Sequence, residues 1–82
     1  MDVFLILRSI TYAQRGKEVL TGRRITARIT RLPMELGENG CGYALRIDRC
    51  ELEKTLEALC SGGITVLRAY TCTAEGYAEV EI

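Results

Sequence analysis

Four cysteines, Cys41, Cys50, Cys60 and Cys72, are the residues of this sequence best suited to chemistry. Their spacing contains no Cys-x-x-Cys pair, and the chain has no histidine that could complete a zinc site. We therefore expect no metal and no cofactor. The absence of histidine also removes the usual partner of a nucleophilic serine or cysteine, which argues against a hydrolase. Without a secretion signal, all four thiols are expected to stay reduced.

Cys41 has the most favourable sequence surroundings for thiol chemistry, because a glycine flanks it on each side. Gly40 and Gly42 carry no side chains, so another macromolecule could approach the sulfur closely. Sulfur transfer requires this kind of access together with a low thiol pKa. The alternative interpretation is that both glycines only satisfy turn geometry and that Cys41 is a small apolar residue beneath the loop.

The other three cysteines have weaker claims to a chemical role. Cys50 falls in the first turn of a predicted helix, where the helix N-terminus could activate its thiol, although an incidental cysteine is the favoured interpretation. Cys72 ends a predicted strand and is assigned no role. Cys60 is expected to be buried, because it continues an apolar helical stripe formed by Leu52, Leu56 and Leu59.

Hydrophobic periodicity predicts a strand, a helix and a strand in the first part of the chain. The apolar run between Asp2 and Arg8 is typical of a central strand. A helix over about 12–21 follows a capping-box pair of Thr11 and Gln14 and ends at Gly22. Strict alternation from residue 25 to residue 30 predicts the second strand. Residues 31–41 contain the single proline and three turn-forming residues, so we expect a loop there.

The second part of the chain repeats this plan. A third strand over 43–48 leads to a second capping-box pair, Asp48 and Glu51, and to a helix that Gly62 and Gly63 end. Residues 64–71 predict a fourth strand, and residues 73–82 alternate after Gly76, as in a short extra edge strand. The sequence therefore predicts a single α+β domain over 1–82 with a ferredoxin-like βαββαβ order. This fold is a two-layer sandwich of a four-stranded antiparallel sheet with two helices on one face.

This layout predicts where the chemistry would take place. The first two strands point the same way, so the end of the first strand, the start of the first helix and the 31–41 loop share one edge. The N–H groups and positive dipole end of the helix would favour a thiolate there. The predicted site therefore has Cys41 as its reactive residue, supported by Gly40, Gly42, Ser9, Thr11 and Arg8.

Charge and size limit the partners of such a domain. Eleven basic residues balance eleven acidic ones, which disfavours nucleic acid and anionic lipid. The longest apolar run, residues 3–7, is too short for a membrane span, so we expect a cytoplasmic protein. A domain of 82 residues has marginal stability, which makes a homodimer plausible, through the open sheet face or the alternating tail.

One segment resembles a known family: Gly40-Cys41-Gly42-Tyr43-Ala44-Leu45-Arg46-Ile47, preceded by Arg31-Leu32-Pro33 and by Ser9 and Ala13. These residues are similar to the small bacterial selenium/sulfur carrier-like proteins, and the resemblance covers about residues 3–70. It implies a ferredoxin-like domain whose loop cysteine, here Cys41, carries a sulfur or selenium atom between a donor protein and an acceptor protein.

Two functions follow as hypotheses. In the first, Cys41 holds a persulfide or selenopersulfide and passes it to an acceptor, and no cofactor is needed. In the second, the protein is a non-catalytic binding or regulatory module. The 31–41 loop and the start of the first helix would then bind a small anion or a protein partner, and Cys41 would be dispensable.

Overall fold

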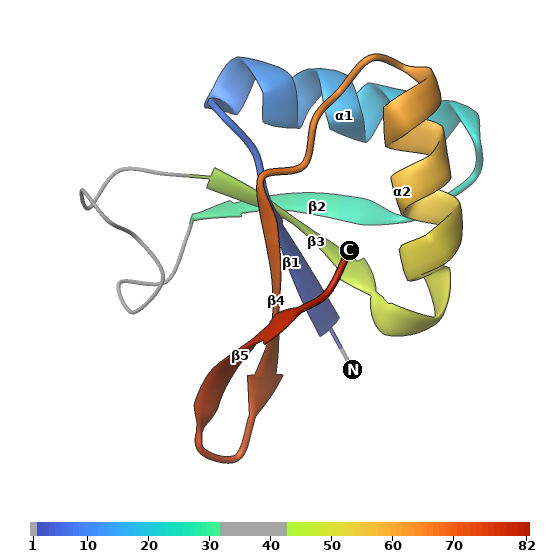
Figure 1. Cartoon of the computed structure of the whole chain (residues 1–82). Coiled ribbons are helices and arrows are strands. Elements are labelled where there is room, and N and C mark those ends of the chain that lie inside the picture. The colour runs from blue at the N-terminus through green and yellow to red at the C-terminus, as the bar shows by residue number, and fades with distance from the viewer. Residues whose placement is uncertain (1, 32–42) are drawn as a thin grey trace.

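A five-stranded antiparallel sheet carries two helices on one of its faces (Figure 1). The computed structural model describes residues 2–31 and 43–82. The elements are β1 (Asp2–Ile6), α1 (Ile10–Gly22), β2 (Ala27–Arg31), β3 (Tyr43–Asp48), a 3-10 turn η1 (Arg49–Glu51), α2 (Leu52–Ser61), β4 (Arg68–Thr73) and β5 (Gly76–Val80). The predicted α+β class and ferredoxin-like order are confirmed, with a fifth strand added at the C-terminal end.

The strand order in the sheet is β2-β3-β1-β4-β5, so β1 is the middle strand. Both β1 and β2 are antiparallel to β3, and they therefore point in the same direction, as predicted. The expected edge strand is also confirmed: β5 pairs with β4, and Gly76 lies opposite Thr73 at the turn. Gly76 adopts a φ of +128°, a conformation that favours glycine in this turn.

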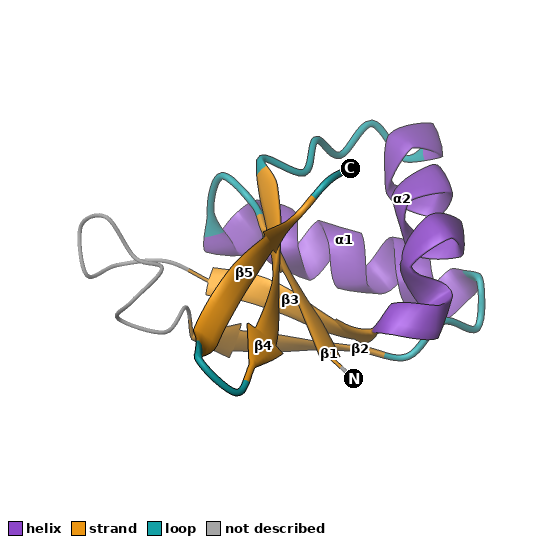
Figure 2. Ribbon diagram, turned by 60° about the horizontal axis from the view of Figure 1, so that its bottom comes forward, coloured by secondary structure: helices purple, strands orange, loops and turns teal. Residues whose placement is uncertain are grey.

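The core lies between the sheet and the helices, which Figure 2 shows on the same side of the strands. Val3 and Leu5 of β1 point into it, because alternate side chains of a strand face opposite sides. From α1, Leu20 is buried and Gly16 lets the helix approach the sheet closely. A Cβ placed on Gly16 would lie 2.9 Å from the Leu45 Cδ1 atom. The sheet therefore packs tightly against α1.

The two helices end in the same way. At the end of α1 the Ile25 N–H donates to the Leu20 carbonyl over 2.8 Å, and the intervening Arg24 has a φ of +60°. At the end of α2 the Ile64 N–H donates to the Leu59 carbonyl over 2.9 Å, and Gly63 has a φ of +75°. These are Schellman-type ends. The predicted end of the first helix is one residue early: α1 includes Gly22, and the left-handed residue that ends it is Arg24 instead of this glycine.

The fourth strand begins later than predicted, at Arg68 instead of residue 64. The N–H of Ile64 is used to close α2, and its side chain is buried, so residues 64–67 form a connection across the core. In the described ranges, 2–31 and 43–82, neither helix has the length and apolarity needed to cross a lipid bilayer.

Candidate functional site

The start of α1 holds three of the predicted site residues, Arg8, Ser9 and Thr11. All three are exposed. Ser9 is the N-cap: its backbone is extended, with φ −159° and ψ 170°, and its Oγ accepts a hydrogen bond from the Tyr12 N–H over 3.4 Å. The capping role predicted for Thr11 is therefore wrong. Ser9 is the cap instead, because it precedes Tyr12 by three residues and has the non-helical backbone that a cap requires.

Electrostatically, this helix end keeps its positive character. The first turn of α1 contains no acidic residue, so no carboxylate offsets the partial charge of its N–H groups. Beside it, Arg8, Tyr12, Gly63 and Thr65 line a small hollow of about 80 Å³. This end of the helix can therefore stabilise a negative charge brought close to it.

The segment that carries Cys41 is attached at the same end of the sheet, where β1 and β2 end and β3 begins. Arg31, the last residue of β2, lies opposite Tyr43, the first residue of β3. Ala44 in turn lies opposite Ile6, the last residue of β1, which precedes the start of α1. The predicted shared edge is therefore present in the described residues. Cys41, Gly40 and Gly42 lie outside them, so their predicted position near Ser9 stays a prediction.

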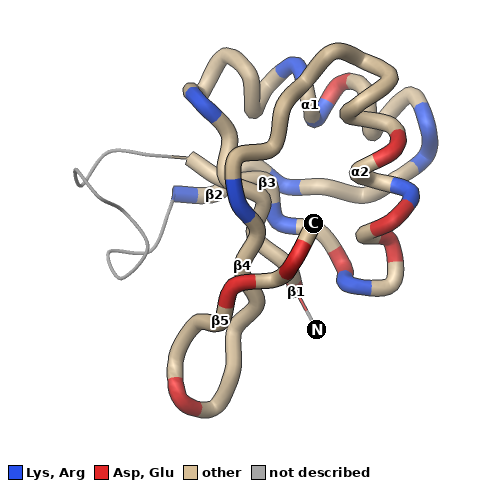
Figure 3. Tube along the Cα trace, viewed as in Figure 1, with Lys and Arg blue, Asp and Glu red and all other residues tan. Residues whose placement is uncertain are grey.

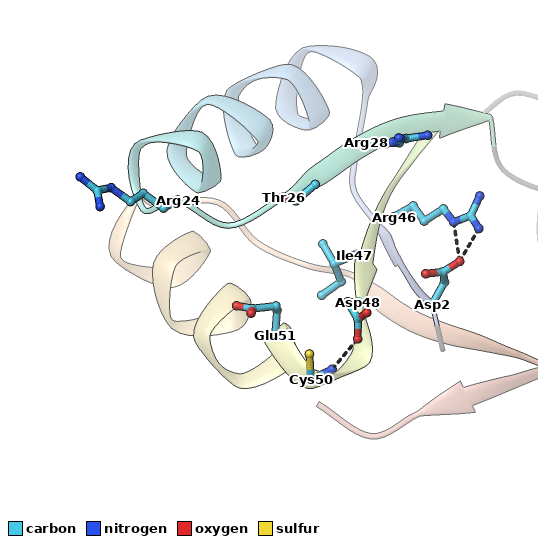
Figure 4. A pocket seen from close by; sticks show the side chains of 9 residues that line it. All are labelled: Asp2, Arg24, Thr26, Arg28, Arg46, Ile47, Asp48, Cys50 and Glu51. Atoms are coloured by element: carbon cyan, nitrogen blue, oxygen red, sulfur yellow. Dashed lines mark hydrogen bonds and ion pairs between the residues drawn. The ribbon is translucent and has the colours of Figure 1, made fainter.

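A larger hollow of about 440 Å³ opens at the opposite edge (Figure 4). The Arg46 guanidinium is ion-paired there with Asp2, and its Nε donates to Oδ2 over 2.7 Å. Charged side chains of both signs surround this hollow, and most of them are exposed. Its lining consists of Asp2, Arg24, Thr26, Arg28, Arg46, Ile47, Asp48, Cys50 and Glu51.

Cys50 lies in this hollow, within η1 at the start of the second helical segment. Asp48 caps this segment, and its Oδ1 accepts a hydrogen bond from the Cys50 N–H over 3.0 Å. Hydrogen bonding between the Asp48 carboxylate and the thiol raises the pKa of Cys50 above its ordinary value, and desolvation and the charge of Asp48 act in the same direction. The raised pKa disfavours activation of Cys50 by the helix N-terminus and agrees with the favoured interpretation, an incidental cysteine in a capped first turn.

Cys60 and Cys72 are free and exposed. The predicted burial of Cys60 is wrong, because the buried side of α2 consists of Thr55, Ala58 and Leu59 and leaves Cys60 outside it. Cys60 instead lies at an open hollow of about 470 Å³ beside Leu56, Val66 and Ile82. The burial of Thr55 was not predicted, because threonine is mostly exposed in proteins. The signal that could have found it is its position on the helix, three residues after Leu52 and four before Leu59.

These features define a small α+β domain in which one sheet edge combines an uncompensated helix start with the attachment points of a cysteine-bearing segment. The family model described as "Putative Se/S carrier protein-like" matches residues 2–71 of the chain. The chain belongs to this family, as the resemblance in the sequence indicated. The chain itself has no match among the curated proteins or the solved structures.

Proposed function

We propose that this protein carries sulfur or selenium, and that Cys41 holds the transferred atom as a persulfide or selenopersulfide. Membership of the selenium/sulfur carrier-like family over residues 2–71 is the observation that carries this proposal. The family match includes Cys41 and its two flanking glycines, the residues with the most favourable sequence for an accessible thiol.

The chemistry is thiol exchange and needs no cofactor. The Cys41 thiolate attacks the outer sulfur of a donor persulfide, R–S–SH. A new S–S bond forms, the donor bond breaks, and the donor leaves as a thiolate R–S⁻. The proton stays on the transferred sulfur, giving Cys41–S–SH. An acceptor thiolate then attacks that sulfur and releases the Cys41 thiolate, so neither step requires an external oxidant or reductant. A selenium atom in the outer position follows the same sequence.

The described residues support a thiolate at this edge of the sheet. Cys41 precedes Tyr43 by two residues, and the start of β3 lies beside the end of β1, from which the chain enters α1. The start of α1 offers N–H groups and a positive dipole end without an acidic neighbour in its first turn. Arg8 adds a positive side chain there. We infer that these groups hold the Cys41 thiol in its reactive form.

Cys50 provides an internal contrast to this arrangement. Its exposed thiol lies beside the Asp48 carboxylate, which raises its pKa. If loading depends on thiolate character, Cys50 should gain sulfur poorly at neutral pH in spite of its exposure. Accessibility alone would instead load Cys50, Cys60 and Cys72 together.

Trypsin separates the four cysteines, which makes the test simple. Cleavage after lysine and arginine places Cys41 in peptide 32–46, Cys50 in 50–54, Cys60 in 55–68 and Cys72 in 69–82. The reduced protein is incubated with inorganic polysulfide, alkylated and digested with trypsin. The mass of each peptide is then measured by mass spectrometry. We expect one added sulfur on peptide 32–46 in preference to the other three.

Two variants complete the experiment. Cys41→Ser should abolish the selective loading, whereas Cys72→Ser, which removes an exposed thiol elsewhere, should leave it unchanged. Equal loading of all four peptides, or of none, would contradict the carrier function. If Cys41→Ala then still bound the natural partner, the non-catalytic binding module would replace the carrier as the function of this chain.

A further inference from the structure

We propose that the sheet face opposite the helices binds a second copy of this chain, face to face. Both helices lie on the other side of the sheet, so no element among residues 2–31 and 43–82 packs over this face (Figure 2). Phe4, Tyr70 and Tyr77 are half-buried aromatic residues of this face, and the Phe4 and Tyr77 rings meet edge to face with centroids 5.8 Å apart. An aromatic centre of this kind is typical of protein interfaces.

One row of side chains crosses all five strands of this face. The strand registers pair Arg28 with Arg46, Arg46 with Phe4, Phe4 with Tyr70 and Tyr70 with Glu79. The row carries Arg28 on β2, the Asp2-paired Arg46 on β3, aromatic rings on β1 and β4, and an acidic side chain on β5. Figure 3 shows basic positions on β2 and β3 and acidic positions on β5 and just beyond its two ends.

The charges at the two ends of the row are available to a partner. Arg28 is exposed and forms no ion pair with the residues in 2–31 and 43–82. Glu79 faces Arg68 at 3.9 Å, too far for a hydrogen bond, and both of these side chains are more than half exposed. An ion pair this open to solvent holds Glu79 only weakly.

The symmetry of a homodimer then selects one arrangement. Because β1 is the middle strand, a twofold axis parallel to β1 places β2 of one copy over β5 of the other. Arg28 then meets Glu79 of the second copy, and the same contact is repeated on the other side of the axis. An in-plane axis perpendicular to β1 would instead place β2 over β2 and bring two Arg28 side chains together, which is unfavourable.

Single-stranded nucleic acid is the other macromolecule that aromatic and basic residues on a sheet could bind. Two contacts argue against it. The Arg46 guanidinium already lies over the Phe4 ring, 5.9 Å from its centroid, and the Asp2 carboxylate neutralises its charge. A base could stack on Phe4 only by displacing this ion pair, so the face favours a protein surface.

Charge reversal at the two ends of the row tests this arrangement. The wild-type protein is expected to form a dimer in sedimentation equilibrium at concentrations up to about 0.5 mM. Arg28→Glu alone and Glu79→Arg alone should each weaken the dimer by about tenfold or more, because each places like charges at both contacts. An equimolar mixture of the two variants should associate again, because the changed position 28 of one copy meets the changed position 79 of the other.

Matched controls come from the rest of the chain. Arg15→Glu on the exposed side of α1 makes the same change in net charge as Arg28→Glu and should leave the dimer intact. A monomeric wild-type protein would overturn the proposal, and so would a mixture of variants that fails to associate although each variant is folded by circular dichroism. Binding of a mixed-sequence RNA 12-mer to a monomer, lost in Arg28→Glu, would assign the face to nucleic acid instead.

Discussion

The Asp48 carboxylate accepts a hydrogen bond from the backbone N–H of Cys50 over 3.0 Å, and the same side chain raises the pKa of the Cys50 thiol. One residue thus caps the turn that begins the second helical segment and suppresses the thiolate within it. Cys50 therefore has a less reactive thiol than a cysteine at a helix start without an acidic neighbour would have. Two predictions depend on this relationship.

The first prediction concerns the reactivity of Cys50. Asp48→Asn keeps an oxygen that can accept from the Cys50 N–H but removes the negative charge, so the pKa of the thiol should fall toward its ordinary value. Iodoacetamide should then alkylate peptide 50–54 faster than in the wild type at a pH of about 8. The Cys72 peptide of the same sample is the control and should react at an unchanged rate. A slower reaction of Cys50 in the variant would contradict this account.

The second prediction concerns acid. The hydrogen bond from the Cys50 N–H lowers the pKa of Asp48, so the ionised carboxylate stabilises the folded state. Its contribution is fully present above the unfolded pKa of about 3.9 and is lost as the pH falls through the lower folded value. Asp48→Ala should therefore reduce the urea midpoint at neutral pH, and the difference from wild type should shrink in acid. A difference that keeps the same size in acid would contradict this account.

The third prediction tests the close approach of α1 to the sheet. A methyl group at Gly16 would meet the Leu45 side chain at 2.9 Å and the Leu59 side chain at 3.3 Å. Gly16→Ala should therefore lower the free energy of unfolding by about 1 kcal/mol, since crowding in the core exceeds the gain in helix propensity. Gly22→Ala is the matched control, because nothing lies within 4 Å of a Cβ there. Urea denaturation should find it as stable as wild type or slightly more stable, and a stabilised Gly16→Ala would refute this packing.

The fourth prediction concerns the hydroxyl of Thr55. This residue is fully buried, and its Oγ1 has no hydrogen-bond partner among the described residues. Thr55→Val keeps the shape and removes the unsatisfied polar atom, so it should raise the free energy of unfolding by about 1 kcal/mol. Thr55→Ser keeps the hydroxyl but loses a buried methyl group and should be destabilising. A destabilised valine variant in urea denaturation would indicate that the hydroxyl has a partner.

Sequence alone determined the order of the elements in this chain. Strand alternation and helical spacing are set by local geometry, so β3, the end of α2 at Gly62-Gly63 and the edge strand after Gly76 could all be predicted. The family of the chain was also readable from the residues around Cys41. Which of two nearby residues caps a helix could not be predicted in the same way. Ser9 caps α1 in place of Thr11, because only the tertiary position of the helix start decides which backbone stays extended.

Tertiary structure decided which side chains face one another. The rotation of α2 about its axis, set by packing against α1 and the sheet, buries Thr55 and exposes Cys60, whereas helical spacing places both residues next to the leucine stripe. Residues 28 and 79 come from distant parts of the chain, and only the strand registers place them at opposite ends of one row. Periodicity tells which side of a strand is apolar, whereas register and helix rotation depend on the summed contacts of the whole core.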